Sequence, residues 1–149
     1  MNRRQFVAAV AATLGGPAVV KAATPIWTYR GASGRMLAGV LSTTDPARHV
    51  QAIAALRRET GFGRPLLYAS TDKLKLPFAL GLIDHLAASG DIWFGVERST
   101  TRGTAGSEPE LDQLAAFLTG CAYGDLAGTR HPLKRTLIEA LRGRTSLIG

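Results

Sequence analysis

The 149-residue sequence has one cysteine, few aromatic side chains (7%) and no apolar run of the roughly 18 residues that a membrane span needs. A single cysteine excludes an internal disulfide and a zinc site built from several cysteines. Charged residues make up only 19% of the chain against 46% hydrophobic residues, which excludes a disordered tail. The scarce aromatics do not interleave with basic residues, so single-stranded nucleic acid is not a favoured partner.

The first residues have the pattern of an export signal. Arg3 and Arg4 are followed by Phe6, then by a weakly apolar stretch over 8–20 and by Lys21. Paired arginines before a weak apolar region are typical of a twin-arginine signal. We therefore predict a signal peptide over residues 1–22, export to a periplasm, and a single mature domain over 23–149. Removing the leader lowers the net charge from +7 to +4.

The mature part predicts a mixed α/β domain with about four strands. β-branched and aromatic residues predict strands at 26–29, 36–42, 66–69 and 91–97, with a turn at 31–34. Helical spacing of apolar residues predicts helices over 46–60, from Lys73 or Lys75 to 88, from 107 through Leu118, and over 133–142.

Helix ends are marked by local signals. Asp45 and Pro46 predict a helix start, and Gly61 predicts its stop. Ser107 and Glu110 fit a capping box for the third helix.

Several segments then resemble a known family. They are Tyr29–Gly34 with the following Met36–Leu41, Leu67–Lys73, Ile92–Glu97 and Asp112–Gly120. In this order they resemble bacterial domain-of-unknown-function family 3800, over about residues 26–142. The resemblance implies a reduced, compact ribonuclease H-like fold with helices packed on a central sheet.

The same resemblance argues against a nuclease. Such nucleases hold two metal ions with several carboxylates. The family's first acidic pair falls on Gly31 and Ala32 in this sequence, and its late aspartate falls on Ala116. Asp91, Glu97 and Asp112 are the acids left for a weaker metal site.

A second catalytic pattern is Ser70-Thr71-Asp72-Lys73 at a helix start. In serine acyl enzymes this spacing lets the lysine take the serine's proton. No Ser-Asp-Asn or Lys-Thr-Gly element follows, so we interpret Ser70 or Thr71 as a helix cap.

The remaining reactive residues show no site spacing. His49, His85 and His131 lie far apart, and Cys121 falls in an apolar helix. We expect a hydrogen-bonded, partly buried His85 and a packed cysteine. The basic residues near 57–64 and 130–144 are interpreted as solvated helix faces.

Together these patterns predict an exported, non-catalytic or catalytically decayed domain without an identified cofactor. It would bind a protein partner, a ligand or a second copy of itself through the sheet edge and the Ser99–Gly106 loop. The alternative is a periplasmic hydrolase. It would be a phosphodiesterase that uses a divalent metal at Asp91, Glu97 and Asp112, or an acyl enzyme that uses Ser70 and Lys73.

Overall fold

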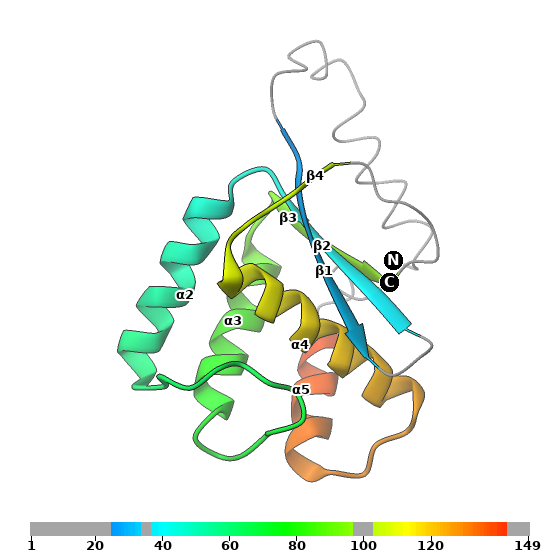
Figure 1. Ribbon diagram of the computed structural model, residues 1–149. Helices are drawn as coiled ribbons and strands as arrows, with labels where there is room; N and C mark the ends of the chain where they lie inside the picture. Colours follow the sequence, from blue (N-terminus) through cyan, green and yellow to red (C-terminus); the bar gives the residue numbers. More distant parts are fainter. Residues whose placement is uncertain (1–24, 34–36, 97–102, 143–149) are drawn as a thin grey trace.

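The computed structural model describes residues 25–33, 37–96 and 103–142 and shows a mixed α/β domain (Figure 1). The predicted leader, Glu97 and Ser99 to Arg102 lie outside these ranges. The elements follow in the order β1 (Trp27–Ser33), β2 (Leu37–Thr43), α2 (Pro46–Thr60), α3 (Leu76–Ala88), β3 (Ile92–Val96), β4 (Thr104–Ala105), α4 (Pro109–Leu126) and α5 (Pro132–Arg142).

The four strands form one mixed sheet in the order β3-β2-β1-β4. β1 and β2 make an antiparallel hairpin with Tyr29 opposite Leu41, and β2 pairs antiparallel with β3. β4 pairs parallel with the first two residues of β1, Trp27 and Thr28. The predicted fold class, a four-stranded mixed α/β domain, is therefore confirmed.

Helix α4 is the centre of the core. It packs on β1 and β2 and contacts α2 and α5, while α3 packs against α2 and α5 (Figure 1). Ten of its residues are buried, among them Leu111, Leu114 and Phe117. Apolar side chains of α3, α5 and β3 complete one continuous cluster with it. Burial of this cluster is the main contribution to the stability of the fold.

Helix α2 has the ends that the sequence predicts. The Asp45 carboxylate accepts a hydrogen bond from the Arg48 N–H at 3.2 Å, and Pro46 occupies the first turn. Gly61 ends the helix at φ 68°, a left-handed conformation that a glycine adopts without a Cβ clash.

Three local predictions are wrong. Gly31 to Ser33 continue β1 instead of turning, because they pair with β2. Leu66–Ala69 is not a strand. The Leu66 N–H donates to the Gln113 side chain, and Lys75 donates to the carbonyls of Leu67 and Ser70, so side chains replace a neighbouring strand.

The capping box is the third wrong prediction. Pro109 takes the first helical position of α4, which makes Glu108 the N-cap instead of Ser107. Glu108 makes no capping hydrogen bond with its side chain. Its carboxylate instead accepts the Tyr29 hydroxyl, at 2.9 Å from each oxygen.

Candidate functional site

Asp91, the first predicted metal ligand, is engaged by basic groups. Its carboxylate accepts hydrogen bonds from the Arg48 guanidinium and contacts His49 Nε2 at 3.0 Å. Burial alone would raise the pKa of Asp91. The hydrogen bonds and positive charge of Arg48, together with His49, outweigh burial, so the pKa of Asp91 is lowered. Asp91 therefore acts as an ionised anchor between α2 and β3.

The other predicted ligands do not join it in the described structure. Asp112 is exposed in the first turn of α4, and Glu97 lies outside the described residues. Within residues 25–33, 37–96 and 103–142, no group of three or more histidine, cysteine, aspartate or glutamate residues could hold a metal ion.

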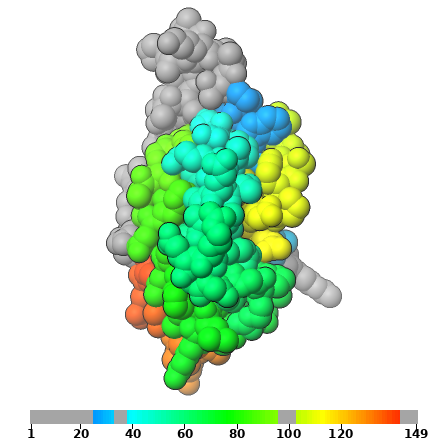
Figure 2. Space-filling view, turned by 90° about the vertical axis from the view of Figure 1, so that its left-hand side faces the viewer, coloured from blue at the N-terminus to red at the C-terminus, as the bar shows by residue number. Residues whose placement is uncertain are grey.

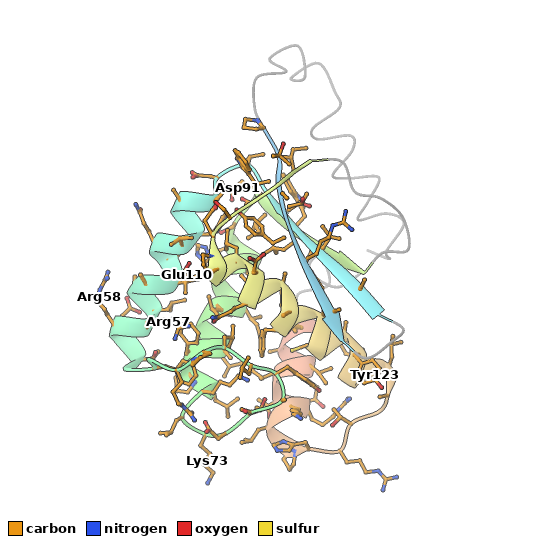
Figure 3. All side chains as sticks on the ribbon, in the orientation of Figure 1. Arg57, Arg58, Lys73, Asp91, Glu110 and Tyr123 are labelled. Carbon is orange, nitrogen blue, oxygen red and sulfur yellow. The ribbon has the colours of Figure 1, made fainter. Side chains whose placement is uncertain are left out.

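Ser70 and Lys73 are both exposed, and no hydrogen bond joins their side chains in the described part of the chain. Figure 3 shows Lys73 at the opposite end of the molecule from Asp91. The buried amine in this loop belongs to Lys75, which is 0% exposed. Its Nζ donates to the Leu67 carbonyl, to the Ser70 carbonyl at 3.1 Å and to Thr71 Oγ1 at 3.3 Å.

Lys75 thus holds the 67–71 loop on α4. Its ammonium also lies 5.0 Å from the centre of the Phe117 ring, a cation–π contact. Burial lowers the pKa of Lys75 from 10.5 to about 8. Two loop carbonyls and the Thr71 hydroxyl fill the donor sites of the ammonium, which identifies Lys75 as a structural clamp.

The lowered pKa predicts a stability effect that Lys75→Met should remove. Between pH 8 and 10.5 the unfolded chain holds a proton that folded Lys75 has released, so the wild type gains stability as the pH rises. From pH 7 to 9.5 we expect the free energy of unfolding to rise by about 1–2 kcal/mol relative to Lys75→Met. Urea unfolding at several pH values measures it. The exposed Lys73→Met is the control, and parallel pH curves for wild type and Lys75→Met would contradict the assignment.

A histidine pair that the sequence did not indicate links α2 to α3. His49 Nδ1 lies 2.8 Å from His85 Nε2, and His49 is only 1% exposed. Burial lowers the pKa of both imidazoles, and Arg48 opposes their protonation as well. With both rings neutral, His49 donates from Nε2 to Asp91 and accepts from His85 at Nδ1. The direction of these hydrogen bonds is therefore fixed: His49 Nδ1 is the unprotonated acceptor inside the pair, and His85 Nδ1 is the unprotonated nitrogen at its outer end.

The hydrogen bonds from His85 to His49 and from His49 to Asp91 tie α2, α3 and the start of β3 together. The Asp91 carbonyl also accepts the Thr43 hydroxyl at 2.8 Å and the Thr44 N–H at 3.2 Å. Sequence spacing could not reveal it, because His49 and His85 are 36 positions apart on different helices. The prediction of a hydrogen-bonded, partly buried His85 is confirmed.

Gly31 and Ala116, two of the positions where the predicted resemblance would place acids, lie in contact. Gly31 of β1 lies directly on α4, where an added Cβ would stand 2.6 Å from the backbone of Ala115 and from the Ala116 Cα. Ala32 points to the exposed side. No side chain fits at Gly31 without a shift of helix or strand.

Most basic residues around 57–64 and 125–142 have structural partners. Arg57 donates to the carbonyls of Phe62 and Arg64 and lies over the Phe78 ring, while Arg64 pairs with Asp72. Arg135 and Arg142 both pair with Asp125. These contacts favour the interpretation of these residues as helix faces rather than a phosphate-binding surface.

A surface groove of about 480 Å³ lies between β1, α2 and α4. The lining residues come from the start of β1, the first turns of α2 and the N-cap of α4: Trp27, Pro46, Ala47, Val50, Gln51 and Glu108. In Figure 2, α2 faces the viewer with the blue start of β1 and the yellow start of α4 beside it. The groove is shallow and open to solvent, and its lining is mainly apolar.

None of the described helices is long and apolar enough to cross a membrane. Comparisons of the chain with protein-family models, with curated proteins and with solved structures found no match.

Proposed function

We propose that this protein is an exported, non-catalytic binding domain of the ribonuclease H-like type. One observation carries the proposal. The place where the resemblance implies converging carboxylates is a close contact between the β1 backbone at Gly31 and the α4 backbone at Ala115 and Ala116. A two-metal site needs room for several carboxylates and two ions about 4 Å apart, and this contact leaves none.

The positions of the remaining candidate residues support the same function. Asp91 is neutralised by Arg48 and bound to His49, and these hydrogen bonds occupy three of the roughly four acceptor sites of its carboxylate. Ser70 is exposed, and the amine that bonds to it in the described structure is that of the structural Lys75, which donates to its carbonyl. The groove at Trp27 and Glu108 offers a binding surface that requires no catalytic group.

Divalent metal and nuclease assays on the full chain test the proposal. We expect a melting temperature unchanged within about 1 °C in millimolar Mg²⁺ or Mn²⁺, because a metal that does not bind the folded state does not stabilise it. We also expect no cleavage of single-stranded or double-stranded DNA or RNA.

A metal-dependent rise of several degrees would contradict the proposal if Asp91→Asn or Asp112→Asn abolished it. Metal-dependent cleavage lost in the same variants would establish the phosphodiesterase alternative. Glu59→Gln, an exposed change on α2, is the matched control for loss of one carboxylate.

A further inference from the structure

The groove combines a mainly apolar lining with one carboxylate, that of Glu108, which has no cationic partner among the described residues. Trp27 and Val50 are half-buried at its lining, and Glu108 lies at the end formed by α4. Among the described residues, Glu108, Glu110 and Asp112 form no ion pair with a lysine or arginine. Within the described part of the chain, Glu108 is the one charged residue of the groove lining, and Glu110 and Asp112 follow it in the first turn of α4.

The Glu108 carboxylate is held in position by a buried phenol. The Tyr29 side chain is 1% exposed, and its hydroxyl donates to Glu108. Burial, and next the hydrogen bond to Glu108, raise the pKa of Tyr29, so this phenol stays a donor at physiological pH. A carboxylate has about four acceptor sites, so Glu108 keeps acceptors for a second donor.

The charges of α4 favour a cation at this position. The N-terminus of a helix carries roughly half a positive charge, whereas Glu108 at the N-cap and Glu110 and Asp112 in the first turn supply three negative charges. Trp27 adds an indole that attracts a guanidinium. Arginine suits both contacts, because its planar guanidinium stacks on aromatic rings and binds carboxylates through two hydrogen bonds.

We propose that this groove binds an arginine side chain flanked by apolar residues in an extended segment of a partner protein. The guanidinium contacts Glu108, and the apolar neighbours cover Trp27 and Val50. This inference rests on the proposed binding function and names the chemistry of the partner.

Peptide titration followed by NMR of the full chain tests it. The probe is the amidated peptide acetyl-Ala-Leu-Arg-Leu-Ala, with a citrulline peptide of the same shape as the neutral comparison. We expect saturable shifts of the Trp27 indole N–H and of amides in 47–51 and 106–111. The Kd should be below about 1 mM for the arginine peptide and at least tenfold weaker for citrulline, since a charged hydrogen bond is worth about 1.5–3 kcal/mol.

Two variants connect the binding to the groove. Glu108→Gln should weaken the arginine peptide about tenfold. Gln51→Lys, on an exposed lining residue, should weaken it similarly by repulsion without a loss of folding. Glu59→Gln, outside the groove, should leave the Kd unchanged.

Equal binding of the arginine and citrulline peptides, shifts located elsewhere, or no shift at millimolar peptide would each overturn the inference. Concentration-dependent changes of the same signals without peptide would overturn it in favour of a second copy of the chain. None of these results involves metal-dependent activity, so this inference can fail while the non-catalytic function stands, and the converse is equally detectable.

Discussion

Gly31→Ala is expected to destabilise the domain by about 3 kcal/mol and to lower its melting temperature by about 10 °C. The added methyl group would stand 2.6 Å from three backbone atoms of Ala115 and Ala116. Backbone atoms of a buried helix cannot move aside as a flexible side chain can, so β1 and α4 must separate. Thermal melting followed by circular dichroism measures the effect.

Two glycines provide controls for the same chemical change. Gly63 and Gly90 have no atom within 4 Å of an added Cβ, and both are exposed. Alanine there should change the stability by at most about 1 kcal/mol, in the stabilising direction, because it restricts the unfolded chain. A Gly31→Ala protein as stable as these controls would show that β1 and α4 are not in close contact, and would reopen the space that a carboxylate site requires.

The parts of the fold that the sequence predicted are those with local causes. Asp45 and Pro46 begin α2 and Gly61 ends it, and each acts on the backbone next to it in the sequence. The β1–β2 hairpin follows equally from two β-rich segments close in the chain.

The wrong predictions depend on distant partners. Leu66–Ala69 has the composition of a strand, but its backbone groups bond to Gln113 on α4 and to Lys75 at the start of α3. Composition does not show whether a strand has a neighbour to pair with. At α4, Pro109 takes the first helical position, so the N-cap is Glu108 and not Ser107. The Glu108 side chain makes no capping hydrogen bond and accepts the Tyr29 hydroxyl instead.

The candidate site was predictable only in part for the same reason. The Ser70–Lys73 pattern drew attention to the correct loop, but α3 begins at Leu76, and Lys75 rather than Lys73 enters the core. The groove joins residues of β1, α2 and α4 that are up to 81 positions apart, and no periodicity in the sequence marks them as neighbours.

The second large effect concerns His49. His49→Leu should reduce the free energy of unfolding at pH 7.5 by about 2–4 kcal/mol, because it leaves the His85 N–H without an acceptor and takes one donor from Asp91. His49→Gln should cost much less, since an amide can donate to Asp91 and accept from His85. Urea unfolding of the three proteins measures the difference.

The pH dependence of the unfolding free energy distinguishes the hydrogen bonds of His49 and His85 from apolar packing alone. Folding lowers the pKa of both His49 and His85, so below pH 6.5 the unfolded chain binds protons that the folded chain resists. Stability is then present above pH 6.5 and is lost progressively as the pH falls toward 5. Arg48 opposes protonation here, whereas Asp91 and Asp45 favour it, and burial decides the direction.

His49→Gln should lose a large part of this dependence, because the remaining imidazole no longer faces a second one. If His49→Gln lost stability with falling pH as steeply as the wild type, the imidazole pair could not be the acid-sensitive element. A flattened curve would instead identify the junction of α2, α3 and β3 as the part of the fold that acid loosens first. The first turns of α2, which line the groove, would then be the surface most affected by that change.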